Sequence, residues 1–467
     1  MNDAYQLVVV GAGPGGYAAA LRASVLGMKT LLVEKDTPGG TCLNRGCIPT
    51  KTFHYSAYLY SKLKEASKYG LTVADPGVDF SLVQQRKQQV VSEQVKGLQG
   101  LLKNEGVEVV LGRAHFVPNG KLEIERNDDG ETQTVTAEKF IIATGSEEVV
   151  PQIPGINLPG IMTSREALEL TSLPSSMAVI GGGVIAVEMA SIFAEFGVEV
   201  TIIQRSELLR REDREMIKRL STFLRRRGIN IITGSVLKEI KESESGYTLG
   251  VKEKDTEKEY TAEKILVAVG RKPSCKGLNP EVVKLEYDEE GIKVDENMET
   301  SQPGIYAVGD VTSSGYFTAH TAFHQGIVAA ENAAGKKSSF NDKVIPVCIF
   351  SQPQLARAGM TEEQARERGY RVKTGKFPFS ANGKAFLQEE GDGIVKIVGD
   401  EDTGTTLGVH ILGPQASELI QEGSLAVASG TRISELADLI HPHPTLSEAV
   451  WEAAMSFSKT SLHVKGR

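Results

Sequence analysis

The segment Gly39-Gly40-Thr41-Cys42-Leu43-Asn44-Arg45-Gly46-Cys47-Ile48-Pro49-Thr50-Lys51 places two cysteines five residues apart. On an ideal helix, five steps of ~1.5 Å separate the Cα atoms by about 7.5 Å, whereas a disulfide requires roughly 4.4–6.8 Å. A Cys42–Cys47 bridge is therefore possible only in a distorted turn, which Gly46 and Pro49 permit, and strain makes a disulfide easier to reduce. Because the chain has only four cysteines in 467 residues, the pair favours redox chemistry over two buried small apolar side chains.

The residues upstream of this segment have the pattern of a dinucleotide-binding unit. Residues 6–10 predict a buried parallel strand, residues 17–26 a helix and residues 30–33 a second strand that ends in Glu34. Three glycines separate the first strand from the helix: Gly11, Gly13 and Gly16. In this arrangement the glycines allow a tight turn, close approach of a pyrophosphate and close helix–strand packing, while the acid accepts a hydrogen bond from a ribose hydroxyl. The combination predicts a bound dinucleotide; the alternative is a glycine-rich turn without a ligand.

The remainder of the first unit is predicted from periodicity. Residues 53–105 carry apolar side chains at helical spacing and predict two helices joined by a loop over residues 70–83. Strands are predicted near residues 107–110 and 121–124, and an apolar run over residues 140–146 closes the unit.

The same pattern recurs from residue 177. Residues 178–180 predict a strand, residues 187–196 a helix and residues 200–203 the next strand. The turn and the strand end supply Gly181, Gly183, Ala186 and Gln204, and Gln204 follows Gly181 at the offset that separates Glu34 from Gly11. Two such units predict two dinucleotides, and together with the cysteine pair they indicate a chain that transfers electrons.

The two units differ where nucleotide choice is decided. An acid at the end of the second strand selects NAD because it binds the ribose diol and repels a 2′-phosphate. The second unit has neutral Gln204 instead, followed by Arg205, Arg210 and Arg211, and arginine side chains bind phosphate well. These residues favour NADP; the alternative is a solvated basic surface.

Composition limits the possible partners and locations. The chain is 40% hydrophobic and 24% charged, with a formal net charge of −8, which argues against nucleic acid or an anionic membrane as partner. No apolar run approaches about 18 residues, so no membrane span is predicted. The N-terminus lacks the basic start of a signal peptide, and Cys275 and Cys348 are isolated, so we expect a reducing cytoplasm.

The Gly39–Lys51 segment resembles the redox-active segment of the pyridine nucleotide–disulfide oxidoreductases, most closely that of the dihydrolipoamide dehydrogenases. Further motifs resemble this family in the correct order and cover essentially the whole chain: residues 140–146, 265–271, 305–310, 318–322, 377–385, 407–419 and 441–448. Residues 181–188 and the spacing of Arg205 and Arg211 depart from the usual dehydrogenase and resemble glutathione reductase, an NADP enzyme.

The resemblance implies FAD as resident cofactor and NAD or NADP as the second dinucleotide. Residues expected at the FAD site are Gly11, Gly13, Gly16, Glu34, Gly40, Thr41, Lys51, Thr144, Gly145, Asp310 and Ala319. Residues expected at the nicotinamide nucleotide are Gly181, Gly183, Ala186, Gln204, Arg205, Arg211, Gly270 and Arg271. His320 and His324 could be metal ligands four residues apart, but no third ligand is evident, so no metal is predicted.

The resemblance also implies roles at the redox centre. Cys42 would exchange with substrate, Cys47 would lie against the flavin, and Lys51 with Glu188 would form an ion pair beside the flavin N5. His443, oriented by Glu448, would be the general base and would act in the other subunit of a homodimer.

Two alternatives remain open near the C-terminus. The residues alone do not distinguish His441 from His443 as the base. Thr445-x-x-Glu448 is also a capping box, so Glu448 could cap a helix, and a carboxylate with two oxygens could serve both roles.

The expected fold is α/β, with two Rossmann-like dinucleotide-binding domains and a C-terminal α+β interface domain. The expected limits are 1–147 and 273–342 for the two parts of the FAD domain, 148–272 for the NAD(P) domain and 343–467 for the interface domain. The expected activity is oxidation of a dihydrolipoyl dithiol, presented by a lipoyl-bearing carrier protein or as a small molecule, with electron transfer to NAD(P)+. The alternative is an NADPH-dependent disulfide reductase of the glutathione reductase type.

Overall fold

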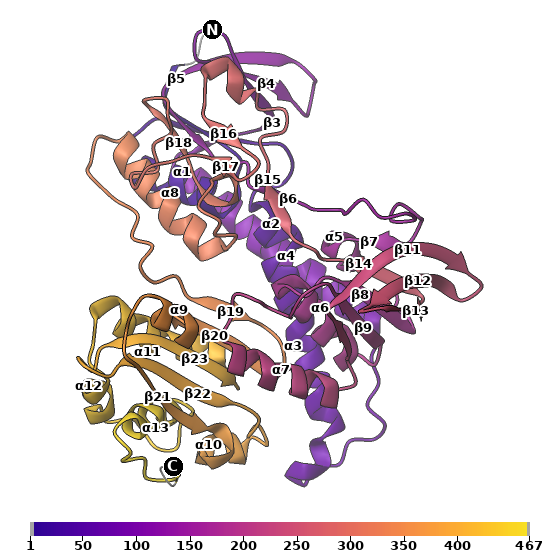
Figure 1. Ribbon diagram of the computed structural model, residues 1–467. Helices are drawn as coiled ribbons and strands as arrows, with labels where there is room; N and C mark the ends of the chain where they lie inside the picture. The colour runs from indigo at the N-terminus through magenta and orange to yellow at the C-terminus, as the bar shows by residue number, and fades with distance from the viewer. Residues whose placement is uncertain (1–3, 465–467) are drawn as a thin grey trace.

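The computed structural model describes residues 4–464, which form three sheet-based units (Figure 1). In the first unit, β1 (Ala4–Val10) lies between β2 (Thr30–Glu34) and β5 (Thr132–Ile142), and all three strands run parallel. β18 (Ile305–Ala307) extends this sheet beside β5, so residues beyond 300 return to the N-terminal unit. Leu7 to Val10 are all buried, as a strand covered on both faces requires.

Helices cover this first sheet and lead to the cysteines. α1 (Pro14–Val25) packs against α8 (Ala319–Ala333), which lies beside it in Figure 1. The approach is close, since a Cβ on Gly326 would come within 2.3 Å of the Gly15 carbonyl oxygen. The other elements are α2 (Gly40–Arg45), α3 (Cys47–Lys64), α4 (Phe80–Asn104), β3 (Glu108–Val117), β4 (Lys121–Arg126), β16 (Tyr287–Asp288), β17 (Gly291–Ile292) and short 3-10 turns at Ala66–Tyr69, Pro280–Val283 and Gly309–Val311.

The second unit repeats the plan with a parallel five-stranded sheet. Its order is β10 (Asn230–Thr233), β9 (Glu199–Gln204), β8 (Ser176–Ile180), β14 (Lys264–Val267) and β7 (Ile161–Met162). Its helices are α5 (Ser164–Ala167), α6 (Val184–Glu195) and α7 (Arg214–Arg226). An antiparallel ribbon follows, made of β11 (Ser235–Ser243), β12 (Gly246–Glu253) and β13 (Thr256–Ala262). β6 (Ser146–Glu148) and β15 (Arg271–Pro273) pair as a two-stranded link between the units.

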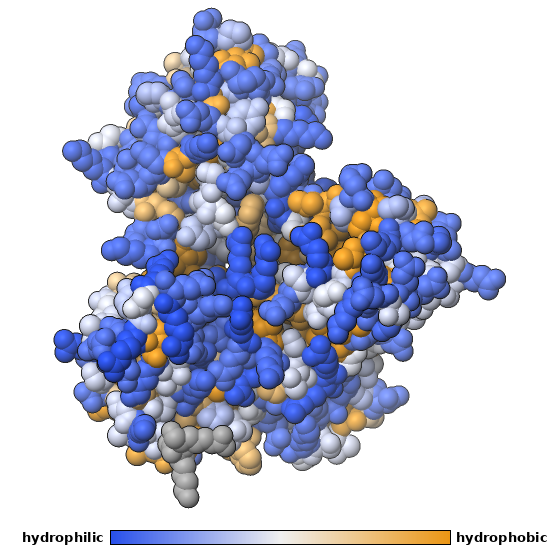
Figure 2. Space-filling model, viewed as in Figure 1, coloured by the Kyte–Doolittle hydropathy of each residue, from blue (hydrophilic) through white to orange (hydrophobic). Residues whose placement is uncertain are grey.

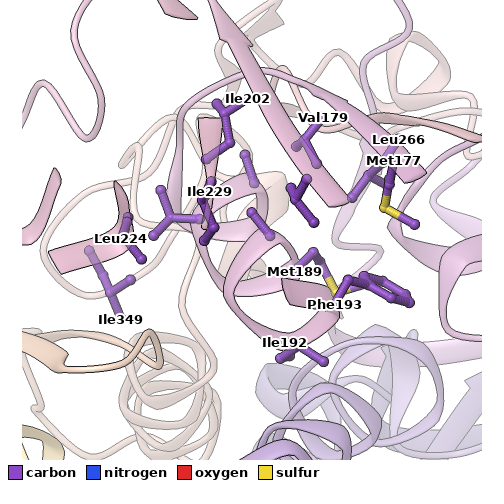
Figure 3. Packing of buried hydrophobic residues seen from close by; sticks show 14 of the residues in the cluster. Met177, Val179, Met189, Ile192, Phe193, Ile202, Leu224, Ile229, Leu266 and Ile349 are labelled. Carbon is purple, nitrogen blue, oxygen red and sulfur yellow. The ribbon is translucent and has the colours of Figure 1, made fainter. Parts of the chain in front are cut away.

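Apolar packing fixes α6 against this sheet (Figure 3). Val179 and Ile202 project from the sheet, and Met189 and Phe193 meet them from α6. Phe53 of α3 belongs to the same buried cluster. The helix that follows the cysteines is thereby held against α6, which carries Glu188.

The third unit has an antiparallel sheet in the order β19 (Val347–Ile349), β20 (Gln354–Gly359), β23 (Thr406–Gly413), β22 (Ile394–Asp400) and β21 (Val372–Pro378). Its helices are α9 (Glu362–Glu367), α10 (Gly383–Leu387), α11 (Ala416–Ser429), α12 (Ile433–Asp438) and α13 (Glu448–Phe457), with a 3-10 turn at Phe379–Ala381. Buried ion pairs join it to α7 and the preceding loop, as between Lys396 Nζ and Asp213 at 2.8 Å. On the face drawn in Figure 2, hydrophilic residues predominate and apolar residues gather where the units meet.

Most predicted elements are present, with three differences in detail. The strand predicted at residues 107–110 extends to Val117, where it pairs with β4 in an antiparallel ribbon. The second helix begins at Phe80, inside the predicted loop, because Asp79 accepts hydrogen bonds from the Ser81 and Leu82 amides and caps it. Leu59, Leu63 and Leu101 share the helical periodicity but are exposed rather than part of the core. Within residues 4–464, no helix is long and apolar enough to cross a membrane.

Candidate active site

The cysteine segment contains the predicted distortion, and Gly46 supplies it. Cys42 lies in α2 and Cys47 opens α3, and between these helices Gly46 adopts φ −141° and ψ −106°. A Cβ at residue 46 would lie 2.9 Å from the Thr41 carbonyl oxygen, so the break requires glycine. Pro49 lies in the first turn of α3, where proline is tolerated. Both cysteines are half-buried thiols in this structure, without a bridge between them.

The two thiols differ strongly in acidity. A hydrogen bond from Cys42 and the charge of Lys51 lower the pKa of Cys47 to about 7, against the opposing effect of burial. The same hydrogen bond and burial raise the pKa of Cys42. Cys47 is therefore the more acidic thiol of the reduced pair, and the thiolate is the reactive form of cysteine.

Lys51 and Glu188 form the ion pair that the family resemblance predicts. Lys51 Nζ lies 2.8 Å from Glu188 Oε2, and the Glu188 side chain is only 5% exposed. The other carboxylate oxygen accepts a hydrogen bond from the Phe350 amide at 2.9 Å. Lys51 Nζ also lies 4.6 Å from the Phe350 ring centroid. These contacts fix a cation one helical turn beyond Cys47.

Replacing Lys51 tests its effect on the neighbouring thiol. Because Lys51 stabilises the Cys47 thiolate, Lys51→Met should raise the pKa of this thiol toward the usual cysteine value of about 8.5. Iodoacetamide alkylation of the reduced protein, followed between pH 6 and 9, measures the change. A matched Lys62→Met variant removes a more distant lysine of the same helix and should leave the profile in place. A profile that Lys51→Met does not move would contradict this electrostatic role.

The loop between β1 and α1 has the shape required by a pyrophosphate. Gly11 adopts φ +99°, and a Cβ there would lie 2.4 Å from the Ala143 carbonyl oxygen. Gly40 approaches Gly13 so closely that its Cβ would lie 2.6 Å from the Gly13 Cα. Gly16 is also tightly packed, and the N-terminus of α1 has no side-chain cap. Its amides are available to an anion.

Two carboxylates assigned to the FAD site are held by local hydrogen bonds. Glu34 accepts hydrogen bonds from the Ala12 and Asp36 amides at 2.7 and 2.9 Å, and burial raises its pKa. Asp310 accepts a hydrogen bond from the Ser146 hydroxyl at 2.6 Å, and burial raises its pKa as well. Carboxylates with spare lone pairs beside a glycine cradle suit the hydroxyl groups of a dinucleotide. The residues present therefore fit FAD.

Other residues assigned to the FAD site lie on neighbouring segments. Thr144 donates a hydrogen bond to the Ser274 carbonyl at 2.7 Å, and Gly145 adopts φ +74°. Thr41 is exposed, and Ala319 begins α8. His320, the next residue, contacts the Pro346 carbonyl through Nε2 at 2.9 Å. Among the described residues, no group of three or more His, Cys, Asp or Glu side chains could hold a metal ion.

The Arg271 side chain is largely but not fully buried, with 13% of its surface exposed. Its guanidinium donates hydrogen bonds to the Ser146 hydroxyl and carbonyl and to Glu148, each at 2.8 Å. Its charge also lowers the pKa of Asp310, although burial is the larger effect and raises it. Arg271 therefore joins the link between the units to a predicted flavin residue, and its assignment to the nicotinamide nucleotide stays a prediction.

The second cradle resembles the first but ends in a different side chain. Gly181 adopts φ +120°, close to the Ala268 carbonyl, and Gly183 precedes α6, which has no side-chain cap. Ala186 is fully buried, and Gly270 adopts φ +142°. The Gln204 amide accepts a hydrogen bond from the Arg205 N–H at 3.1 Å and donates one to Ser206 at 2.9 Å. Arg205 and Arg211 are exposed.

His443 and Glu448 have the predicted geometry. His443 Nδ1 lies 2.9 Å from Glu448 Oε1, while Oε2 accepts a hydrogen bond from the Thr445 amide at 2.8 Å. The carboxylate thus orients the His443 ring with one oxygen and accepts a backbone hydrogen bond with the other. The reciprocal half of the capping box is absent, because α13 starts after Ser447 and the Thr445 hydroxyl donates to the Pro442 carbonyl. The His443 side chain is 75% exposed.

His441 has a different environment. Its Nε2 lies 3.0 Å from Glu422, its ring stacks on Trp451, and its side chain is only 8% exposed. His443 is thus the histidine available to a substrate. Figure 1 shows α13, the helix that follows this loop, far from α2.

Phe350 and Ser146 belong to the site but are not predicted from the sequence. Phe350 orients both members of the Lys51–Glu188 pair, and Ser146 links Asp310 to Arg271. Neither belongs to a spacing pattern, and only the contacts made by the folded chain identify them.

Known proteins with similar sequences and structures identify the family. Residues 5–326 match the family described as pyridine nucleotide-disulphide oxidoreductase, and residues 345–454 match its dimerisation domain. Dihydrolipoyl dehydrogenase of Bacillus subtilis (strain 168) is 40% identical, over 99% of this chain and 100% of that protein. Dihydrolipoyl dehydrogenase of Thermus scotoductus is 42% identical, over 99% of both chains. The chain belongs to the pyridine nucleotide-disulphide oxidoreductase family, which confirms the resemblance and the α/β fold.

One similar solved structure is named a disulfide reductase rather than a dehydrogenase. The Cu(II) complex of the HOCl-induced flavoprotein disulfide reductase RclA from Escherichia coli superposes with a TM-score of 0.87. It is 31% identical and covers 97% of this chain and 99% of that chain. The fold is therefore shared between proteins named as dehydrogenase and as reductase.

Proposed function

We propose that this chain is an FAD-dependent dihydrolipoyl dehydrogenase that oxidises a dithiol through Cys42 and Cys47 and passes the electrons to NAD(P)+. The observation that carries the proposal is the asymmetric thiol pair beside the Lys51–Glu188 ion pair. Full-length similarity to proteins named dihydrolipoyl dehydrogenase supports the substrate class. A dihydrolipoyl group on a carrier protein, or a small dithiol, is the proposed substrate, and cytoplasm the proposed location.

The chain's own residues perform the thiol chemistry. In the oxidised enzyme, Cys42 and Cys47 form a disulfide. A substrate thiolate attacks Cys42, the sulfur on α2, which breaks the Cys42–Cys47 bond and releases Cys47 as a thiolate. The substrate's second thiol then attacks the substrate sulfur bound to Cys42, which closes the substrate disulfide and releases Cys42 with the proton of that thiol. When bound, FAD would supply the redox chemistry that links the reduced cysteines to the nicotinamide. The Glu34 and Asp310 carboxylates would hold its hydroxyl groups, and Lys51 would supply a fixed positive charge.

The base in this scheme comes from a second subunit. His443 is exposed, the helix α13 that follows it lies far from α2 in Figure 1, and the match to a dimerisation domain supports a homodimer. Exposed apolar side chains on the third unit are suited to such an interface: Phe386, Leu387, Leu425, Leu439 and Ile440. In the dimer, the partner subunit's His443 would accept the proton of the attacking substrate thiol.

Assays with both disulfide and dithiol substrates test the proposal. Dihydrolipoamide with NAD+ or NADP+ should give the highest kcat/KM, and oxidised glutathione with NADPH should give little turnover. The second candidate is a glutathione-reductase-type enzyme, which the missing acid at Gln204 favours. Rapid NADPH-dependent reduction of glutathione disulfide would favour that candidate and reject the first.

Nucleotide preference is a separate prediction. Gln204 carries no charge to repel a 2′-phosphate, and Arg205 and Arg211 are exposed beside the cradle. Charge-assisted hydrogen bonds of about 1.5–3 kcal/mol each, reduced by solvent, should give roughly ten- to hundredfold preference for NADP. Gln204→Glu combined with Arg205→Leu should reverse it, chiefly through KM for the nucleotide. A clear NAD preference of the unmutated protein would mean that the arginines form only a solvated surface.

A further inference from the structure

A row of basic side chains crosses the antiparallel sheet of the third unit. The strand register places its members directly opposite one another on neighbouring strands: Arg357 of β20, His410 of β23, Lys396 of β22 and Lys376 of β21. Residues that are directly opposite one another share one face of a sheet. Burial lowers the pKa of His410 to about 4, so at neutral pH the row holds three cations and one neutral imidazole. The mechanism proposed above gives this row no role.

Acidic side chains of the second unit meet the basic row. The ion pairs across this junction are Glu212–Arg357, Asp213–Lys396 and Glu215–Lys376, with closest N···O distances of 2.6, 2.8 and 2.7 Å. The Glu212 side chain is only 7% exposed. Burial raises the pKa of Glu212, and the charge of Arg357 opposes this, so Arg357 helps to keep the carboxylate ionised. Charged groups that are largely withdrawn from water thus join the third unit to the segment that enters α7.

The loop that ends at this junction begins in the second nucleotide cradle, directly after Gln204. The Leu209 N–H donates a hydrogen bond to the Gly182 carbonyl at 2.8 Å, so the loop touches the glycine turn. A Cβ on Gly182 would lie 2.8 Å from the Leu208 side chain. Leu209 adopts φ +46°, a left-handed conformation that is uncommon for residues other than glycine. Such a conformation persists only where the surroundings hold it, and here the cradle lies on one side and the ion pairs on the other.

We propose that the basic row of the third unit positions the loop of residues 205–211 for recognition of the 2′-phosphate of NADP. Arg205 and Arg211 are the residues of this loop expected at that phosphate, and Arg211 lines the same cavity as Glu212 and Arg357. The ion pairs hold the loop before the nucleotide arrives, so less ordering remains to oppose binding. Arg357 acts through Glu212 and is a positioning residue. The inference rests on the proposed function, since it requires a nicotinamide nucleotide at the second cradle.

Removal of one ion pair tests the positioning role. The Arg357–Glu212 pair is suitable, because Asp213 has a second task as the cap of α7, where it accepts hydrogen bonds from the Glu215 and Met216 amides. Arg357→Met combined with Glu212→Gln removes both charges together, which avoids leaving one charge buried without a partner. Calorimetric titration of the oxidised, FAD-loaded dimer with NADP+ and with NAD+ then gives two Kd values without any electron transfer.

The double variant should bind NADP+ about tenfold more weakly than wild type and NAD+ within about twofold of wild type. Only NADP+ engages the arginines of the loop, so the added cost of ordering the loop falls on NADP+ alone. A matched variant, Arg371→Met with Glu401→Gln, removes an exposed Arg–Glu pair of the same unit and should bind both nucleotides as wild type does. A ratio of the two Kd values that is the same in the double variant and in wild type, whatever its value, overturns the positioning role.

The outcomes separate this inference from the function on which it rests. If wild type oxidises dihydrolipoamide with neither nucleotide, the proposed activity fails, while the Kd ratios still decide the role of the basic row. Binding of neither nucleotide overturns both. If the double variant does not fold, hydrogen exchange of the wild-type dimer gives the answer. The amides of residues 208–213 should be protected before nucleotide is added, and protection that appears only with NADP+ would refute the proposal.

Discussion

Cys47→Ser should lower dithiol turnover at least about a thousandfold, because serine can neither complete the disulfide nor hold a thiolate. The hydrogen bond from Cys42 lowers the pKa of the Cys47 thiol to about 7, so a substantial fraction is thiolate in the reduced enzyme at neutral pH. A thiolate against a flavin gives a long-wavelength charge-transfer absorbance, and Cys47→Ser should lose this band on anaerobic two-electron reduction. Steady-state assays and absorbance spectra of the same preparation measure both effects.

Two matched variants make this result specific. Cys42→Ser should also lose turnover but keep the Cys47 thiolate and its absorbance, because only the exchange sulfur is removed. The serine hydroxyl at residue 42 can still donate a hydrogen bond to Cys47, so the Cys47 thiolate should remain stabilised. Cys275→Ser alters a cysteine outside the pair and should leave turnover within about twofold. Full turnover and an intact band in Cys47→Ser would show that the redox centre lies elsewhere.

The parts of the fold that the sequence predicts well are those with local causes. A buried strand, a glycine turn and a helix are consecutive in both nucleotide units, and β1 and β8 appear where the apolar runs place them. The helix break between the cysteines requires glycine at residue 46, because a Cβ there would come too close to the Thr41 carbonyl oxygen. The extension of β3 to Val117 was missed because it depends on pairing with β4 rather than on its own residues.

The parts of the site that the sequence misses depend on long-range contacts. Lys51 and Glu188 are 137 residues apart in the sequence. Their ion pair is predicted from the family resemblance and not from any local pattern. The amide of Phe350 reaches Glu188 across 162 residues, and no local pattern encodes that contact. Arg271 is expected at the nicotinamide nucleotide from the resemblance alone, and only the folded chain shows that the pairing of β6 with β15 places it against Ser146 and Glu148.

His443→Ala should reduce dihydrolipoamide turnover at least about 100-fold, the lower range for loss of a general base. The ring is exposed and oriented by Glu448, which leaves one nitrogen free for a substrate proton. The half-reaction between flavin and nicotinamide does not involve this proton, so stopped-flow flavin reduction by the reduced nucleotide should be nearly unchanged. Equal losses in both half-reactions would indicate misfolding or a broken dimer.

Two further variants separate the base from its support. His441→Gln changes a histidine that is held by Glu422 within its own chain, so it should affect stability more than turnover. Burial opposes ionisation of Glu448, but hydrogen bonds from Thr445 and His443 hold its pKa below the usual range. Glu448 is therefore an anion at neutral pH and orients the His443 ring through its hydrogen bond to Nδ1. Glu448→Gln keeps the shape of the side chain but removes the charge, so turnover should fall, though less than in His443→Ala. Unchanged turnover in Glu448→Gln would mean that the ring does not depend on this carboxylate.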